Sequence, residues 1–148
     1  MKGQLRGAPR IVRVAAAQMG PIQASDSRES CVQRLCALLH RAADQGATLV
    51  VFPELALTTF FPRWFVDDIS TVDHYYERSM PSPATAPLFS AARERKIGFS
   101  LGYAELTDDG RRFNTQVLVD QTANVVAKYR KVHIPGHATN EPGRAFQH

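Results

Sequence analysis

The sequence predicts an α/β domain in which strands and helices alternate along the first part of the chain. Two apolar runs rich in β-favouring residues, 11–18 and 49–52, flank a segment with helical periodicity. A second helical segment and three strand-like segments follow, without repeats, low-complexity tracts or an internal linker. The 148 residues match the length of one domain, and 44% hydrophobic with 22% charged residues is typical of a globular protein.

The first strand and the first helix are predicted from a change of pattern. Residues 11–18 are rich in apolar side chains without clean alternation, which favours a strand covered on both faces. From Asp26 a helical period begins, and Asp26 with Glu29 resembles a capping box, while Gly46 is suited to end the helix. With the next strand, this helix predicts a right-handed strand-helix-strand unit. The predicted apolar stripe of the helix comprises Val32, Leu35, Cys36, Leu39, Ala42 and Ala43.

A single carboxylate, Glu54, follows the second strand inside an apolar stretch. Pro53 cannot continue a central strand, so Glu54 should lie just past its carboxyl end, where open α/β sheets bind ligands. In apolar surroundings the pKa of a carboxyl rises, and the group becomes a usable general base near neutral pH. The alternative is a buried acid that an arginine or backbone amides neutralise, and this stretch alone does not decide between the two.

Aromatic side chains cluster directly after Glu54, within residues 58–65, and show no clean period. They form either a core loop packed on the sheet or an aromatic wall beside the carboxylate. We expect at least one of the first three rings to wall a pocket that contains Glu54, with the others in the core. The four aromatic residues are Phe60, Phe61, Trp64 and Phe65.

The remaining segments predict a loop, a helix and three strands. Residues 67–79 are polar and predict a loop with a short helix, and 87–96 predict a short α-helix packed on the sheet. Residues 97–105 alternate with period two, and an Asp-Asp-Gly turn joins them to the next strand, 113–119, as a hairpin. Residues 125–132 predict the last strand.

Lys131 ends an otherwise apolar face of that last strand. A desolvated lysine next to a carboxylate can stay charged and stabilise an oxyanion, although a lysine at a strand end can also simply extend into solvent. Because Glu54 and Lys131 can each neutralise the other, we expect their charged groups to approach to within about 4 Å.

The distribution of charge and the spacing of the cysteines and histidines argue against nucleic-acid binding and against a metal site. The net charge of +4 comes from scattered lysines and arginines, so we expect no nucleic-acid partner. Cys31 and Cys36 are five residues apart in one predicted helix and form neither a local disulfide nor a zinc site. His133 and His137 have helical ligand spacing, but a proline and a glycine lie between them, so we expect no metal site.

The amino terminus has a basic segment followed by an apolar one. Arg13 interrupts the apolar residues 11–17, and the run is too short for a signal peptide or a membrane span. We therefore predict a cytoplasmic protein without a membrane partner.

Several motifs occur in an order that resembles the nitrilase superfamily of carbon-nitrogen hydrolases, and the resemblance extends over nearly the whole chain from about residue 11. Within the superfamily, the fuller text around these motifs is similar to the N-carbamoyl-D-amino acid hydrolases. Residues 138–145 differ from the corresponding loop of those enzymes, which lies near their substrate entrance. The motifs are Phe52-Pro53-Glu54, Gly102-Tyr103, Arg112-Phe113-Asn114-Thr115, Lys128-Tyr129-Arg130-Lys131-Val132-His133 and Pro135-Gly136-His137.

The resemblance implies a four-layer α-β-β-α sandwich, of which residues 1–148 form a single partial domain, roughly the N-terminal half. It implies a catalytic glutamate, lysine and cysteine and no cofactor, with Glu54 and Lys131 as the first two. The family's cysteine comes later in the chain than residue 148, and the two cysteines of the predicted first helix do not match it. We expect His133, Pro135 and His148 to bind substrate.

The resemblance implies hydrolysis of an N-carbamoyl-D-amino acid, or a related small amide, to the D-amino acid, carbon dioxide and ammonia. Two alternatives are a non-catalytic truncated member of the family that only binds or assembles, and an unrelated basic module that binds nucleic acid. Without the thiol, residues 1–148 alone should be inactive. A sandwich cut midway should expose an apolar edge and face, so we expect a homo-oligomer or pairing with a complementary C-terminal half.

Overall fold

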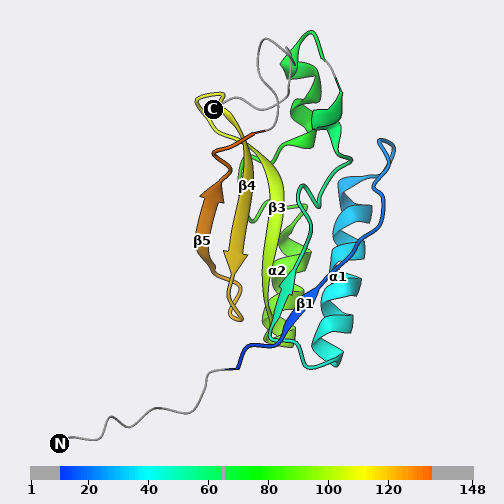
Figure 1. Ribbon diagram of the computed structural model, residues 1–148, viewed down its shortest axis with the longest axis vertical. Helices are drawn as coiled ribbons and strands as arrows, with labels where there is room; N and C mark the ends of the chain where they lie inside the picture. The colour runs from blue at the N-terminus through cyan, green and yellow to red at the C-terminus, as the bar shows by residue number, and fades with distance from the viewer. Residues whose placement is uncertain (1–10, 65, 135–148) are drawn as a thin grey trace, which may run out of the picture.

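The computed structural model describes residues 11–64 and 66–134, which form a five-stranded sheet with strand order β1-β2-β3-β4-β5 (Figure 1). The pairs β1–β2 and β2–β3 are parallel, and the pairs β3–β4 and β4–β5 are antiparallel. The predicted α/β class and the predicted order of the elements are confirmed. The strands are β1 (Val14–Ala16), β2 (Leu49–Val51), β3 (Gly98–Leu106), β4 (Arg112–Val119) and β5 (Val125–Arg130).

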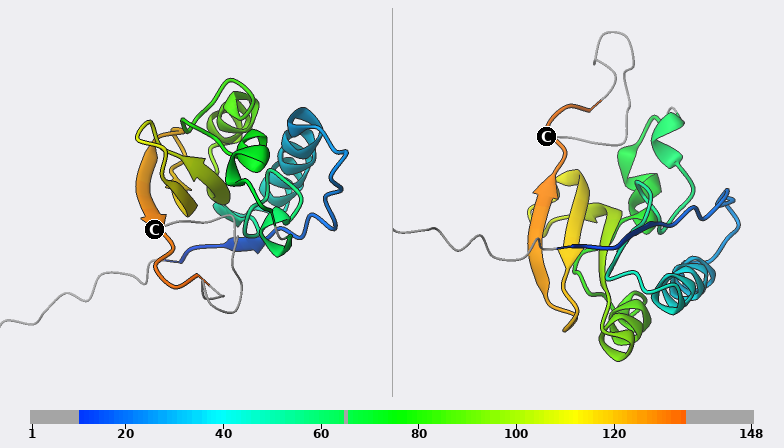
Figure 2. Two further views of the ribbon diagram at one scale, coloured as in Figure 1. Left: turned by 90° about the horizontal axis from the view of Figure 1, so that it is seen from above. Right: turned by 60° about the horizontal axis from the view of Figure 1, so that its bottom comes forward.

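Two α-helices, α1 (Arg28–Asp44) and α2 (Ala86–Arg95), lie next to each other on one side of the sheet (Figure 2). Their apolar sides pack with the alternate strand residues that face them, so one layer of helices covers one layer of sheet. This core positions the strand ends from which the candidate site is built. Its fully buried side chains include Leu35, Leu39, Val50, Leu88, Phe99, Leu101, Val117 and Val119. No helix in the described part of the chain is long and apolar enough to cross a membrane.

Helix α1 begins one residue later than the predicted capping box implies. The hydroxyl of Ser27, not the Asp26 carboxylate, accepts the hydrogen bond from the backbone N–H of Ser30, at 3.1 Å. Asp26 instead accepts from the backbone N–H of Gln23 in the preceding turn, at 3.0 Å. Both are short acceptor side chains at adjacent positions, and only the backbone path of the turn decides which one reaches the helix.

Strand β1 differs from its prediction in length and in burial. It has three residues instead of eight, it pairs only with β2 among the described strands, and Val14 is exposed. The α-helices cover only one face of the sheet, and in the described residues the second apolar cluster buries just Ala104 and Leu106 of β3 on the other face, so part of that face stays open. Alternation along the other strands places Val51 and Leu118 on this open face, and both are exposed.

Between β2 and α2 the described residues form two 3-10 helices, η1 (Phe61–Arg63) and η2 (Ile69–Tyr75), around a second, smaller apolar cluster. Phe61 is fully buried there and stacks on Tyr75 with ring centroids 4.9 Å apart. The loop with a short helix that polarity predicts for 67–79 is therefore present as η2. The β3–β4 hairpin closes through the predicted turn, where Gly110 has a φ of 81° that favours glycine.

Candidate active site

Glu54 is the third residue after the end of β2, close to the predicted position just past this strand. The chain stays beside β3 here, because Phe52 donates to the Ser100 carbonyl and Ala56 to the Gly102 carbonyl, each at 2.9 Å. Gly102 permits this approach, since a Cβ at that position would lie 3.0 Å from the Glu54 Cα.

Leu55 turns the chain directly after the carboxylate. Its φ of 50° is in the left-handed region, which costs free energy for a residue with a side chain, and its own side chain is buried in the second cluster. Glu54 in contrast remains partly open, with 44% of its side chain exposed. A strained residue next to a carboxylate is a common feature of functional sites.

Lys131 meets Glu54, as its face on the last strand predicts. The Lys131 Nζ lies 2.8 Å from Glu54 Oε1. The lysine follows the last residue of β5, and its backbone N–H still donates to the Asn114 carbonyl at 2.8 Å, which extends the pairing with β4 by one residue. The ion pair therefore joins two residues that are 77 positions apart in the sequence, one following β2 and the other following β5.

Asn114 is a third member of this site that the sequence reasoning did not assign. Its side-chain amide donates to the same oxygen of Glu54 that accepts from Lys131, and Asn114 itself is buried. The Arg-Phe-Asn-Thr motif that contributes to the family resemblance contains it. Its role depends on strand register, since Asn114 is the residue of β4 whose carbonyl binds the Lys131 backbone.

The pKa of the Glu54 carboxyl is lowered, which corrects the expectation of a raised pKa. Partial burial acts to raise it, but the hydrogen bonds from Lys131 and Asn114 and the positive charge of Lys131 outweigh that effect. The apolar neighbours in sequence do not surround the carboxylate, because Phe52, Leu55 and Ala56 are buried in the core while Glu54 points to two donors. Glu54 is consequently ionised at neutral pH.

A cavity of 370 Å³ lies beside Glu54 and is bordered by the loop that precedes α1 and the loop that follows β2. Phe60 lines this cavity, which confirms that one ring of the aromatic cluster walls a pocket with the carboxylate. Phe61 is buried in the second cluster and Trp64 packs against it. Thr59 and Arg63 also line the cavity, so it has an apolar wall with a few polar groups, as small-molecule sites do.

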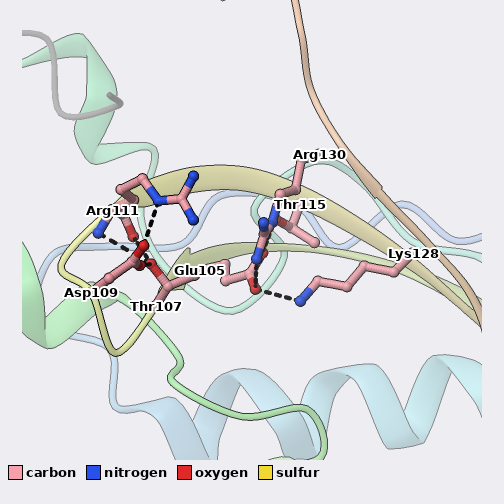
Figure 3. Close-up of polar contacts among 7 residues, drawn as sticks. All are labelled: Glu105, Thr107, Asp109, Arg111, Thr115, Lys128 and Arg130. Atoms are coloured by element: carbon pink, nitrogen blue, oxygen red, sulfur yellow. Dashed lines mark hydrogen bonds and ion pairs between the residues drawn. The ribbon is translucent and has the colours of Figure 1, made fainter. Parts of the chain in front are cut away.

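A second carboxylate, Glu105 on β3, is the centre of another charged cluster (Figure 3). Its oxygens accept hydrogen bonds from Thr115 Oγ1 at 2.7 Å, from Arg130 Nε at 2.9 Å and Nη2 at 2.8 Å, and from Lys128. Burial acts to raise the pKa of this carboxyl, but these donors lower it to about 2. The alternation of β5 places Lys128 and Arg130 on one face, yet only the cross-strand register shows that Glu105 is their partner.

The other predicted site residues are not brought to Glu54 by the described structure. His133 is exposed two residues beyond Lys131, and Pro135 and His148 lie outside the described residues. Within residues 11–64 and 66–134, no group of three or more histidine, cysteine or acidic side chains could hold a metal ion. Cys31 and Cys36 are unbridged on α1, and burial raises the pKa of both thiols, so neither is an activated nucleophile.

Comparison with known proteins assigns the chain to a class that this site fits. Residues 13–147 match the carbon-nitrogen hydrolase family, and the chain belongs to that family. It is 28% identical over 130 residues to omega-amidase NIT2 from Homo sapiens, covering 84% of this chain and 44% of the human protein. It is 33% identical over 130 residues to a nitrilase from Paraburkholderia phymatum, covering 83% of this chain and 37% of that protein.

Solved structures show the same fold. An amidase from Nesterenkonia sp. AN1 matches with a TM-score of 0.71 and 24% identity, covering 93% of this chain and 49% of the amidase. A carbon-nitrogen hydrolase from Helicobacter pylori G27 matches with a TM-score of 0.70 and 18% identity, covering 92% of this chain and 44% of the other. The chain thus spans less than half the length of each of these relatives.

Proposed function

We propose that Glu54 and Lys131 act with a cysteine outside residues 1–148 to hydrolyse the carbon-nitrogen bond of a small amide. The observation that carries this proposal is the contact of Glu54 with Lys131 and Asn114 next to a cavity. The family match supports hydrolysis of this bond type. The Nesterenkonia amidase supports a thiol nucleophile, because its structure is described as having acrylamide added at the active-site cysteine.

In this mechanism Glu54 takes the thiol proton as sulfur forms a bond to the carbonyl carbon. Lys131 stabilises the oxyanion of the tetrahedral intermediate, and the carbon-nitrogen bond breaks as Glu54 returns the proton to the departing ammonia. Glu54 then takes a proton from water, which attacks the thiol-bound intermediate. The carbon-sulfur bond breaks, and the thiol regains its proton.

The substrate we favour is an N-carbamoyl-D-amino acid, in which ammonia leaves first and the released carbamic acid breaks down to carbon dioxide and the amino acid. Arg63 supports a substrate with a free carboxylate. It lines the same cavity as Glu54, its guanidinium lies 5.7 Å from the centre of the Trp64 ring, and it makes no ion pair with the described residues, so its N–H groups can make a bidentate contact with a carboxylate. An omega-amide of a dicarboxylic acid carries the same carboxylate, so Arg63 fits both substrates and the assay must separate them.

The test is ammonia release by the protein that contains this chain together with its cysteine, from N-carbamoyl-D-amino acids, N-carbamoyl-L-amino acids and omega-amides in parallel. Arg63→Gln should raise KM for substrates with a carboxylate and leave an uncharged amide unaffected. Equal turnover of L-carbamoyl compounds or faster turnover of omega-amides would contradict the substrate we favour. Absence of ammonia from every amide would contradict the reaction class.

The alternative of a non-catalytic binding or assembly module is not favoured, because the family is one of hydrolases and the charged pair is assembled. Reading the coding sequence downstream of codon 148 in every frame distinguishes the two, since catalysis requires a cysteine-bearing segment. A cytoplasmic location and homo-oligomeric assembly, or pairing with a complementary half, stay predictions.

A further inference from the structure

Lys131 directly follows strand β5, yet most side chains of this strand are exposed among the described residues. Among residues 11–64 and 66–134, the strand lies at the edge of the sheet and pairs only with β4, and Val125, Val126 and Tyr129 on it are exposed. Its pairing is also irregular next to Leu118. A slip of one residue would move every side chain of a strand to the opposite face. The position of Lys131 therefore depends on whatever fixes the register of this strand.

Glu105 contacts β5 from the face opposite to the candidate active site. Lys128 and Arg130 alternate with Lys131, so they point to the face of the sheet on which Glu105 lies, while Lys131 points to Glu54. The Glu105 carboxylate reaches them across β4, where Thr115 adds a third donor (Figure 3). One carboxylate thus connects three adjacent strands.

The contact is specific for one register. Arg130 lies directly opposite Thr115, and its guanidinium both binds Glu105 through two nitrogens and lies 4.1 Å from the centre of the Phe113 ring. Glu105 is only 5% exposed, so losing the cations would leave a buried charge without partners. A shift of β5 by one residue would bring Tyr129 and Lys131 to this face and remove Arg130 and Lys128 from it.

We propose that Glu105 is a positioning residue for Lys131: it holds Lys128 and Arg130 on one face of β5 and so places Lys131 beside Glu54 on the other. This role rests on the proposed function of the Glu54–Lys131 pair. Positioning Lys131 is a different role from stabilising the fold through a buried ion pair. Glu77 also forms a buried ion pair, so it shows what the second role alone would do. Glu77 is 8% exposed, and its backbone pairs with β3 beside Glu105, but its carboxylate pairs with Arg28 of α1 at 2.7 Å and shows no ion pair with β5 among the described residues.

The experiment uses the protein that contains this chain together with its cysteine and compares Glu105→Gln with Glu77→Gln as the matched control, by two measurements that need no turnover. The first is hydrogen exchange of the Lys131 amide, which is bonded to the Asn114 carbonyl. The second is carboxyl-detected NMR titration of Glu54. In Glu105→Gln the Lys131 amide should exchange about tenfold faster or more, and the pKa of Glu54 should rise toward the ordinary value. In Glu77→Gln neither should change.

Unchanged exchange and titration in Glu105→Gln, or equal changes in both variants, would overturn the positioning role. If Glu105→Gln does not fold, Arg130→Gln is the second variant, because Lys128 and Thr115 still bind the Glu105 carboxylate in it. Faster exchange of the Lys131 amide and a raised pKa of Glu54 are expected in this variant too. If neither is seen, the positioning role of Glu105 is overturned. In an active protein, Glu105→Gln should lower kcat with little change in KM. A protein that releases no ammonia at all would contradict only the proposed function, because both NMR measurements remain informative.

Discussion

At the scale of single residues, the candidate site depends on donors that come from other strands. Glu54 is surrounded by apolar residues in sequence, yet its pKa is lowered because Lys131 and Asn114 reach it from β5 and β4. Its position and its pairing with Lys131 could be predicted, since both follow from where strands end and which face a side chain shares. The direction of its pKa shift and the role of Asn114 could not, because they require the register of β4 against β5.

Asn114→Ala tests the third member of the site. It removes one hydrogen bond to the Glu54 carboxylate, so the pKa of Glu54 should rise and kcat should fall by about tenfold or more. Steady-state ammonia release by the active protein measures the effect. The control is Asn124→Ala, since Asn124 lies in the exposed turn before β5 and bonds only to turn residues there. Equal activity of both variants would exclude Asn114 from the site.

Glu105 predicts a pH dependence of stability. Its pKa in the folded protein is about 2, below the ordinary value of 4.5, so its stabilising effect is complete above about pH 4.5 and is lost as the pH falls toward 2. After allowance for the solvent exposure of Lys128 and Arg130, we expect Glu105→Gln to cost about 1–2 kcal/mol at pH 7. Urea unfolding should show this difference shrinking steadily below pH 4.5. A difference that is constant with pH would mean that Glu105 stabilises by packing and not by charge.

At the scale of the elements, local pattern predicted the order and approximate bounds of the helices and strands. The hairpin turn and the end of β2 depend on glycine and proline, whose backbone restrictions are local, and both were predicted correctly. Strand β1 was predicted too long and too buried, because an apolar run does not reveal that one face of the sheet lacks a covering layer. The start of α1 was displaced by one residue, because Asp26 and Ser27 are both good capping residues.

Ser27→Ala tests the observed cap. Loss of the hydroxyl that accepts from the Ser30 amide should lower the free energy of unfolding by about 1 kcal/mol, measured in urea. Ser25→Ala in the preceding turn, for which the structure shows no capping contact, should change it by less than about 0.5 kcal/mol. Equal losses in both variants would mean that the Ser27 hydroxyl does not cap α1.

At the scale of the whole molecule, the open face of the sheet is the largest departure from a self-contained fold. Exposed apolar side chains on several strands lie on it or at its edges, among them Val14, Val51, Leu118 and Tyr129. The four-layer sandwich implied by the family resemblance would cover this face with a second sheet. Only one layer of helices and one layer of sheet are present in the described residues, and the chain spans less than half the length of its relatives.

The 148-residue chain by itself should therefore associate. We expect purified protein to form oligomers or aggregates by light scattering after size-exclusion chromatography, because contiguous apolar surface favours contact between copies. Leu118→Lys, which places a charge in the middle of the face, should raise the monomer fraction, whereas Gln121→Lys in the exposed turn after β4 should not. A monodisperse monomer of the unsubstituted chain would show that the open face is tolerated in water.

Ammonia release from an amide substrate by the protein that includes the cysteine, compared between Glu54→Gln and Glu77→Gln, tests the central claim most directly. Glu54→Gln removes the proposed base and the partner of Lys131, so kcat should fall by about a hundredfold or more while the protein stays folded. Glu77→Gln removes a more deeply buried carboxylate outside the site and should retain turnover. Wild-type turnover by Glu54→Gln would contradict the assignment of this residue as the catalytic base.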